Sequence, residues 1–322
     1  MKRIDLHTHS WCSDGGQSPE ELVREAAEQG LDILALTDHD GTYGIEAALE
    51  AGKHCGVDVI GGVEFSSYLE TYDCHMHILG LGIDWSEARM AEKMIWIREK
   101  RKERNARMLD IFHQLGFELT MEDMKLYPEQ DYVGKPNMAR ALVNRGYASS
   151  IQEVFESERM LKAPQMKVVR RDRIPAEEAI ELIHGAGGLA ILAHPFKVFW
   201  EGRISPSRHP FDDPIHEQYR RHFETILEKL VTRGLDGMEC FYSSHSREET
   251  EYLCALAQKH GLWITAGSDY HGANMREGVR LAGCWKGWEQ ELVPDAVKAV
   301  ERSANALVAR MHGQQGSSEE QK

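Results

Sequence analysis

Residues 3–41, "RIDLHTHSWCSDGGQSPEELVREAAEQGLDILALTDHDG", contain two apolar strands separated by one helix. Ser18 is placed to cap the helix, Pro19 suits its first position, and Glu21 completes a capping box. Gly30 ends the helix directly before the second apolar run. A strand, a helix and another strand in this order predict parallel pairing through a crossover helix, and therefore an α/β fold.

Two histidines stand at the end of the first strand. Side chains alternate between the two faces of a strand, so His7 and His9 point to the same side. Two imidazoles on one face suit a shared metal ion, but they also suit ordinary polar residues at a strand end. The pair alone leaves both interpretations open.

The composition is that of an ordinary globular chain. It has 322 residues, of which 42% are hydrophobic and 28% charged, and this is enough to bury a large core. No apolar run approaches the ~20 residues that span a bilayer, and the start lacks a signal-peptide pattern. The 6 cysteines are scattered without a Cys-x-x-Cys pair, which favours a reducing, cytoplasmic location. The formal net charge of −14 disfavours long polyanions and anionic membranes as partners.

Strands and helices alternate over residues 1–85 and again over residues 173–310. About seven strand–helix units can be counted, which is enough to close a barrel. Between residues 86 and 172 the pattern is helical throughout, which predicts an inserted all-helical cap domain. The proline-containing first half of residues 198–234 is expected to be a loop, and the polar residues 311–322 a disordered tail.

Histidines and carboxylates gather at the carboxyl ends of the predicted strands. In chain order they are His7 and His9, then Asp38, His39 and Asp40, then Glu64, His75 and His77, then His194, and finally Asp269 and His271. The carboxyl ends of barrel strands share one edge, so this set predicts a metal site rather than packing. The set exceeds the about four or five ligands of one zinc-like ion, which implies two or three divalent ions. Glu64, the only Glu in the set, is the natural bridge, and Mn, Zn and Fe all suit these donors.

The same motifs resemble the PHP (polymerase and histidinol phosphatase) superfamily. They are "DLHTHS" with "SDG", then "ALTDHD", "GVEFSS", "HILGLGID", "LAHP" and "GSDYHG", in the order characteristic of that superfamily. The helical insert, with "GKPNMARALVNRG" ahead of "VFESE", is similar to the cap of the subgroup that contains TrpH-type nucleotide phosphatases and 5′-to-3′ exoribonucleases. The resemblance implies a distorted (β/α)7 TIM-like barrel, an inserted helical cap and three metal ions.

The resemblance also implies how the ligands divide among the ions. The first ion would be held by His7, His9, Glu64 and Asp269, the second by Glu64, His77 and His194, and the third by Asp14, His39 and His271. His77 is preferred to His75 because it directly precedes "ILGLGID". Asp14 marks the subgroup, since related histidinol phosphatases often have His at that point. Catalysis would rest on Glu64, Asp269 and His194, which would hold a hydroxide between the first two ions.

Substrate contacts are predicted mainly in the helical insert. Where the subgroup commonly has Arg-Pro-His, this chain has Lys135, Pro136 and Asn137, which keeps the positive charge but loses the bidentate fork of Arg. Lys135 and Arg140 are expected to contact an anion, and Asn137 belongs to the same substrate-binding motif. His245 follows a later strand, and it either contacts the substrate phosphate or leaving oxygen or simply precedes the next helix.

Basic residues are concentrated at 93–107 and 159–173 of the insert. One interpretation is that the cap binds an anion. The other is that residues 93–107 form a solvated helix face on which Lys and Arg pair with Glu99 and Glu103. The sequence does not choose between the two.

The residues and the resemblance together predict a metal-dependent phosphohydrolase that acts on a small phosphomonoester, a nucleoside monophosphate or 3′,5′-bisphosphate, by hydroxide attack. The alternatives are a 5′-to-3′ exoribonuclease acting on short RNA, a histidinol-phosphate phosphatase, and a non-catalytic metal-stabilised binding module. The negative net charge weighs against the exoribonuclease, whereas the basic insert allows it. Asp14 and the cap weigh against histidinol phosphate as substrate. We infer no membrane association and no protein partner.

Overall fold

The computed structural model of the chain describes residues 2–127, 130, 132–169, 173–200, 211–273, 275, 278–285 and 294–319. The helices are α1 (Pro19–Glu28), α2 (Ile45–Cys55), α3 (Ala88–Gln114), α4 (Met121–Met124), α5 (Lys135–Asn144), α6 (Ile151–Glu156), α7 (Pro164–Lys167), α8 (Ala176–Gly185), α9 (Pro214–Thr232), α10 (Arg247–His260) and α11 (Pro294–Glu319). The strands are β1 (Ile4–Thr8), β2 (Ile33–Leu36), β3 (Asp58–Leu69), β4 (Cys74–Leu81), β5 (Ile174–Pro175), β6 (Leu189–Leu192), β7 (Phe199–Trp200), β8 (Gly237–Tyr242) and β9 (Trp263–Gly267).

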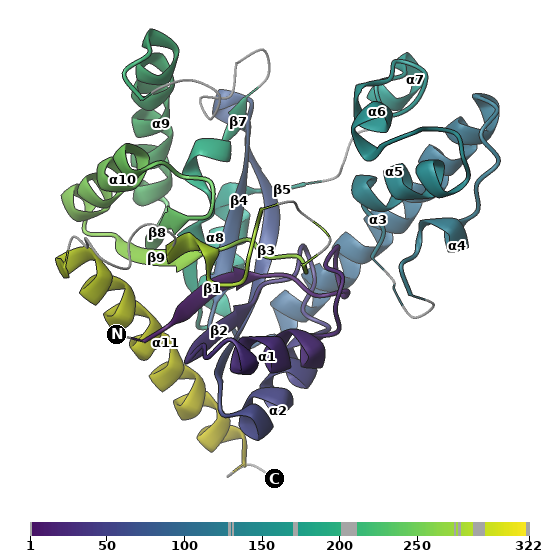
Figure 1. The fold of residues 1–322 in the computed structure, drawn as a ribbon. Helices are drawn as coiled ribbons and strands as arrows, with labels where there is room; N and C mark the ends of the chain where they lie inside the picture. The colour runs from purple at the N-terminus through teal and green to yellow at the C-terminus, as the bar shows by residue number, and fades with distance from the viewer. Residues whose placement is uncertain are drawn as a thin grey trace.

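The strands form one sheet that curves into a nearly closed barrel. Its order is β1-β2-β3-β4-β6-β8-β9, and the short strands β5 and β7 pair with β3 and β4 off this path. The two ends of the order meet, because Thr8 and Tyr270 form a bridge and the Asp269 amide donates to the His7 carbonyl at 2.9 Å. Helices α1, α2, α8, α10 and α11 pack around the sheet (Figure 1). The predicted α/β class with a distorted barrel of seven main strands is confirmed.

Strand β4 departs from the uniformly parallel sheet that the alternation predicted. Strands β1 to β3 are parallel, and so are β6, β8 and β9, but β4 is antiparallel to both β3 and β6. Its connection from β3 is the short turn 70–73, which has no room for the crossover helix that parallel strands need. Parallel pairing was therefore a wrong prediction at β4, and the amino-terminal half of β4 lies at the edge where its neighbours end.

The helix start signals of the sequence are in place. The Ser18 hydroxyl accepts from the Glu21 amide at 3.1 Å, and the Glu21 carboxylate accepts from the Ser18 amide at 2.9 Å. Ser246 and Glu249 form the same capping box at the start of α10. These reciprocal bonds satisfy amide groups that have no partner inside the helix.

Helices α3 to α7 lie together at one side of the barrel (Figure 1). We call residues 88–167 the helical segment. The carboxyl-terminal half of α3 and the shorter helices enclose an apolar core of their own, which includes Met108, Phe112 and Leu142. The first turns of α3 instead join the barrel core through Met90 and Met94. Helix α3 thus connects the two cores.

Two stretches were expected to be irregular. Within 198–234, residues 201–210 lie outside the described residues, and α9 fills the second half after its N-cap Asp213. Helix α11 continues to Glu319, where the sequence analysis expected a disordered tail over 311–322. Buried Leu307 and Met311 anchor α11 to the barrel, and the sequence beyond them has no proline to end a helix. Within the described ranges, no helix has the length and apolar character needed to cross a bilayer.

Candidate metal centre

The predicted ligands meet at one edge of the barrel. They are His7 and His9 at the end of β1, His39 after β2, Glu64 in β3, His77 in β4, His194 after β6, and Asp269 and His271 after β9. The position of His77 depends on strand direction. It lies in the first half of β4, and it reaches the common edge because β4 runs opposite to its neighbours.

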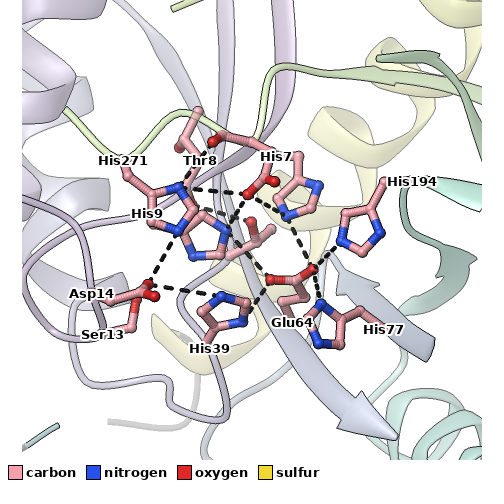
Figure 2. A network of polar contacts seen from close by, with 12 residues as sticks. His7, Thr8, His9, Ser13, Asp14, His39, Glu64, His77, His194 and His271 are labelled. Atoms are coloured by element: carbon pink, nitrogen blue, oxygen red, sulfur yellow. Dashed lines mark hydrogen bonds and ion pairs between the residues drawn. The ribbon is translucent and has the colours of Figure 1, made fainter. Parts of the chain in front are cut away.

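Glu64 is the centre of this cluster (Figure 2). Its carboxylate is fully buried, and the imidazoles of five histidines approach it from both sides. Atom Oε1 lies 2.8 Å from His77 Nδ1, 3.0 Å from His194 Nε2 and 3.3 Å from His7 Nε2. Atom Oε2 lies 2.7 Å from His39 Nδ1 and 3.4 Å from His9 Nε2. A carboxylate with nitrogen donors around both oxygens suits a ligand that bridges two ions.

Two aspartates complete the cluster on the side away from His77. Asp14 Oδ1 lies 3.1 Å from His271 Nε2 and 3.7 Å from His39 Nε2. Asp269 Oδ1 lies 3.3 Å from His9 Nε2. Asp14 comes from the turn that follows β1, so the folded chain brings this turn residue next to the strand-end histidines.

The potential ligand atoms form overlapping groups in which all atoms lie within 4.8 Å of one another. The groups are His9, Asp14, His39 and His271; His7, His9 and Asp269; His7, Glu64 and His194; and His39, Glu64 and His77. Each predicted ligand belongs to at least one group, whereas His75 belongs to none of these and lines the neighbouring cavity instead. Because His7, His9, His39 and Glu64 are shared between groups, the division of ligands among individual ions stays a prediction.

The cluster contains potential metal-binding atoms that have no hydrogen-bond partner in the part of the chain that the structure describes, and these atoms fit divalent cations. Among the described residues, the buried atoms without a hydrogen-bond partner include His7 Nε2, both ring nitrogens of His9, Asp14 Oδ1, Glu64 Oε2, His194 Nδ1 and His271 Nε2. Buried polar atoms without partners cost free energy unless another group satisfies them. Imidazole nitrogens and carboxylate oxygens that face one another are the donor set of Zn, Mn and Fe.

Burial and charge act in opposite directions on the pKa values of the cluster. Burial raises the pKa of Glu64, but the surrounding histidines, His39 foremost, outweigh it and hold that pKa well below its ordinary value. Burial lowers the pKa of His39, but Glu64 and Asp14 outweigh it and raise that pKa to about 10. Burial and the neighbouring imidazoles lower the pKa of His9 well below its ordinary value. Glu64 is therefore ionised, as a metal ligand must be.

Three residues of the site other than glycine have positive φ angles. They are Asp40 at 50°, His194 at 27° and Asp269 at 58°. Residues with a side chain rarely adopt this conformation, and when they do the surrounding structure has to hold them there. Backbone strain is therefore concentrated in the loops that carry the candidate ligands.

Glu239 in β8 supports two ligands and was missed by sequence reasoning. Its Oε1 accepts from His7 Nδ1 at 3.0 Å, and its Oε2 accepts from the His194 amide at 2.7 Å. Gly267 makes room for this contact, since a Cβ there would lie 2.2 Å from Glu239 Oε1 and 2.3 Å from His7 Cβ. The available signal was one Glu inside the apolar run "GMECFY", where an acidic residue is buried only if it is paired.

Other carboxylates at the edge hold the loops rather than join the ligand groups. Asp5 accepts from the Ser268 amide at 2.9 Å and from the Ser268 hydroxyl at 2.6 Å. Asp38 accepts from the Ser10 amide at 2.8 Å and from the hydroxyls of Ser10 and Ser13. Because these oxygens are occupied by hydroxyl and amide donors, Asp38, which the strand-end pattern included, has a structural role.

A cavity of about 950 Å³ opens next to the cluster. Asp14, His39 and His77 of the cluster line it, and the β3–β4 hairpin contributes Tyr68, Glu70, Asp73 and His75. The helical segment and the residues that follow it contribute the basic side chains, which are Arg101, Arg104, Lys135, Lys167 and Arg173. A phosphorylated molecule in this cavity would meet both candidate metal ligands and basic side chains.

The predicted substrate contacts have different positions. Lys135 lines the cavity. Asn137 is buried and accepts from the Gly134 amide at 3.1 Å, while Arg140 donates to the Met124 carbonyl at 3.3 Å. Neither Asn137 nor Arg140 is among the residues lining the cavity, so both support the helical segment in this structure.

His245 also lies away from the cavity lining. Its Nδ1 donates to the Cys240 carbonyl at 3.1 Å, and its ring centroid lies 5.0 Å from that of Tyr242. Burial lowers the pKa of His245 to about 4. Of the two interpretations of His245, this placement favours the residue that precedes a helix.

The structure supports the solvated-face interpretation for part of residues 93–107, and anion binding by the cap stays a prediction. Lys100 pairs with Glu103 at 2.9 Å and Lys102 with Glu99 at 3.2 Å on the exposed face of α3. Arg101 is instead buried, pairs with Asp40, and lines the cavity. The charge pattern alone could not separate these roles, since both kinds of residue lie on one helix.

Known proteins resemble this chain in sequence and in fold. The PHP domain family matches residues 5–233. The chain is 31% identical over 315 residues to a 3′,5′-nucleoside bisphosphate phosphatase of Chromobacterium violaceum, covering 96% of this chain and 99% of the relative. It is 31% identical over 296 residues to the 5′-3′ exoribonuclease Rnm of Escherichia coli, covering 89% and 94%. Among solved structures, a candidate metal-dependent phosphoesterase of Bifidobacterium adolescentis superimposes with a TM-score of 0.70 at 28% identity, covering 92% and 94%. The chain therefore belongs to the PHP domain family.

Proposed function

We propose that this chain is a metal-dependent phosphohydrolase that releases phosphate from a small phosphomonoester, a nucleoside monophosphate or 3′,5′-bisphosphate. The observation that carries the proposal is the Glu64 carboxylate, buried among five histidines, two of which, His39 and His77, line a cavity that is also lined by basic side chains. The cluster supplies ligands for divalent cations, and the basic side chains supply cations for phosphate oxygens. Few other reaction classes need both ligands for divalent cations and basic side chains for phosphate oxygens.

The residues in the cluster fit two or three ions of Mn, Zn or Fe. Bound divalent ions lower the pKa of water and polarise phosphoryl oxygens, which is the chemistry that phosphoester hydrolysis needs. Glu64, Asp269 and His194 would hold these ions at the reacting centre. The Tyr242 hydroxyl donates to Asp269 Oδ2 at 2.8 Å, and Lys197 Nζ lies 3.4 Å from the same oxygen. These two donors keep the Asp269 carboxylate oriented towards the cluster.

The helical segment is proposed to act as the cap of the site and to select the substrate. Lys135 is exposed at the start of α5 and lines the cavity, so it is the residue we assign to a phosphate oxygen. Tyr68 lines the same cavity and offers aromatic surface to a nucleobase. The C. violaceum relative is a phosphatase of 3′,5′-nucleoside bisphosphates, and this supports a nucleotide as the substrate here.

A 5′-to-3′ exoribonuclease acting on short RNA is the second candidate function. The similarity to the exoribonuclease Rnm favours it. The cavity lining opposes it, because Glu70 and Asp73 are among the lining residues and would repel the additional phosphates of an RNA chain. We therefore prefer a substrate short enough to lie between the cluster and the basic side chains of the cavity.

A phosphate-release screen of Mn-loaded protein tests the proposal. The substrates are nucleoside monophosphates and 3′,5′-bisphosphates, 5′-phosphorylated short RNAs, histidinol phosphate and sugar phosphates. We expect the highest kcat/KM with a mononucleotide and a weak dependence on salt. With RNA the release of mononucleotides is followed as well, because hydrolysis of a phosphodiester liberates nucleotides rather than phosphate. A higher kcat/KM for mononucleotide release from RNA that falls steeply with salt would support the exoribonuclease, because binding of a polyanion is strongly salt-dependent.

Two variants separate catalysis from folding. Glu64→Gln and Asp269→Asn are expected to abolish turnover while circular dichroism shows a folded protein. Full activity of Asp269→Asn would contradict the assignment of the metal centre. Bound metal without turnover of any phosphoester would show that the chain is a binding module instead.

A further inference from the structure

The connection between α4 and α5 reaches from the helical segment onto the loop that carries Asp14. Gln130 is buried, and its Nε2 donates to the Ser13 carbonyl at 2.8 Å and to the Trp11 carbonyl at 3.3 Å. The Tyr127 hydroxyl donates to the Gly16 carbonyl, and the ring centroids of Tyr127 and Trp11 lie 4.5 Å apart. The backbone on both sides of Asp14 is thus held by side chains of the helical segment.

The same part of the helical segment holds His39. The Tyr132 ring is nearly parallel to the His39 ring, with an interplanar angle of 18° and centroids 6.4 Å apart. The Arg101 guanidinium lies 4.0 Å from the Tyr132 centroid and pairs with Asp40, the residue after His39. Asp40 has a positive φ of 50°, and its Oδ1 accepts from the Ser66 amide at 2.7 Å. The loop of His39 is therefore held between the barrel and the helical segment.

The other side of the cluster is supported from within the barrel. Glu239 holds His7 and the His194 amide, and the Tyr242 hydroxyl holds Asp269. Asp14 and His39 both belong to the ligand group that also contains His9 and His271. This group is the part of the metal centre whose geometry depends on where the helical segment sits.

We propose that Gln130 and Tyr132 are positioning residues for the ion held by His9, Asp14, His39 and His271, so that occupation of this one site and seating of the helical segment on the barrel are coupled. The inference rests on the metal centre of the proposed function, but not on its substrate. Coupling of this kind is reciprocal: the seated segment raises the affinity of the site, and the bound ion stabilises the seated segment. Groups that orient metal ligands typically change metal affinity by about 10- to 100-fold.

Metal titration of variants tests the first direction of the coupling. We will compare Tyr132→Ala, Tyr132→Phe and Gln130→Met by calorimetric titration with Mn and by the metal content after dialysis. Gln130→Met is expected to weaken one equivalent of metal by about 10- to 100-fold and leave the remaining equivalents unchanged. Tyr132→Ala is expected to weaken the same equivalent and any other ion that His39 helps to bind. Tyr132→Phe keeps the ring over His39 and is expected to bind like the unmodified chain. If Tyr132→Ala does not fold, the comparison is made with Gln130→Met alone.

Arg145→Ala is the matched control. Arg145 pairs with Asp123 at 2.7 Å inside the helical segment, so this variant perturbs the segment without touching either ligand loop. Unchanged binding of every equivalent in Gln130→Met, or an equal loss in Arg145→Ala, would overturn the inference. A chain that binds no metal before any substitution would instead overturn the metal centre itself, so the two failures are distinguishable.

Hydrogen exchange tests the reverse direction. Addition of Mn is expected to slow amide exchange over the connection between α4 and α5 in the unmodified chain. In Asp14→Ala, which removes a candidate ligand of the coupled site, this protection should disappear while protection around β8 remains. Equal protection of the connection in both proteins would contradict the coupling.

Discussion

Glu239→Gln is the substitution that best tests whether a buried residue orients the metal ligands or only stabilises the fold. Glu239 is buried in β8, and its two oxygens accept from His7 Nδ1 at 3.0 Å and from the His194 amide at 2.7 Å. Gln has the same shape but only one acceptor oxygen. If that oxygen faces the His194 amide, the Gln NH2 group faces His7 Nδ1, which must then accept a hydrogen bond.

The consequence is a change of tautomer at His7. An imidazole that accepts at Nδ1 carries its proton on Nε2, the atom that lies 3.3 Å from Glu64 and would bind the metal. The opposite orientation of the Gln amide leaves two donors facing each other at the His194 amide. Either arrangement loses a charge-assisted hydrogen bond worth about 1.5–3 kcal/mol. A loss of that size corresponds to a decrease in metal affinity of about 10- to 100-fold, and kcat/KM should fall with it.

The assay compares thermal unfolding with and without metal, together with calorimetric titration of Mn. We expect Glu239→Gln to lower Tm more in Mn than in EDTA, because the lost contact matters most when His7 binds metal. Glu249→Gln is the matched control. Glu249 is also a buried Glu bonded to a histidine, since it lies 3.1 Å from His216 Nε2, but the pair joins α9 to α10 outside the cluster.

Two results would refute this reasoning. One is that Glu239→Gln binds Mn with the affinity of the unmodified chain, and the other is that its Tm falls equally in Mn and in EDTA. In that case Glu239 contributes to packing, and the ligation of His7 does not depend on it. An equally large loss of Mn affinity in Glu249→Gln would also refute the reasoning. It would show that replacing any buried Glu bonded to a histidine weakens Mn binding.

Three further predictions follow from the same contacts. Gly267→Ala should reduce the free energy of unfolding by about 1–3 kcal/mol and weaken metal binding, because its Cβ would overlap Glu239 and His7; calorimetric unfolding and metal content check this. Removal of metal with EDTA should lower Tm and readdition of Mn should restore it, since a ligand at about 100 times its Kd adds about 2.7 kcal/mol; an unchanged Tm would argue against bound ions. Lys135→Ala should raise KM for a nucleotide about 10- to 100-fold without changing Tm, as measured by steady-state kinetics, and an unchanged KM would remove Lys135 from the substrate site.

Most candidate ligands could be predicted from the sequence because they stand beside an apolar strand, whereas Asp14, in the turn after β1, was implied only by the family resemblance. His7 and His9 follow one face of β1, and Glu64 and Asp269 lie where buried runs meet polar residues. Strand edges of an α/β barrel converge, so local patterns were enough to predict that these donors share a site. All predicted ligands do fall into the overlapping donor groups.

The supporting residues could not be predicted in the same way. Glu239 is 232 positions from His7 along the chain, and Gln130 is 117 positions from Ser13. The residues next to a buried Glu in a strand or a Gln in a loop do not indicate which distant residue that side chain will contact. The antiparallel direction of β4 was missed for a related reason, because apolar periodicity indicates a strand but not which way it runs beside its neighbours.

The sequence by itself determined the α/β class, the helix caps and the inventory of metal-binding donors, because these depend on residues within a few positions of one another. Only the tertiary structure decided which donors surround Glu64, that His77 reaches the common edge on a reversed strand, and that Arg101 is buried beside Asp40. These outcomes depend on contacts between distant parts of the chain, where burial and geometry outweigh local preference.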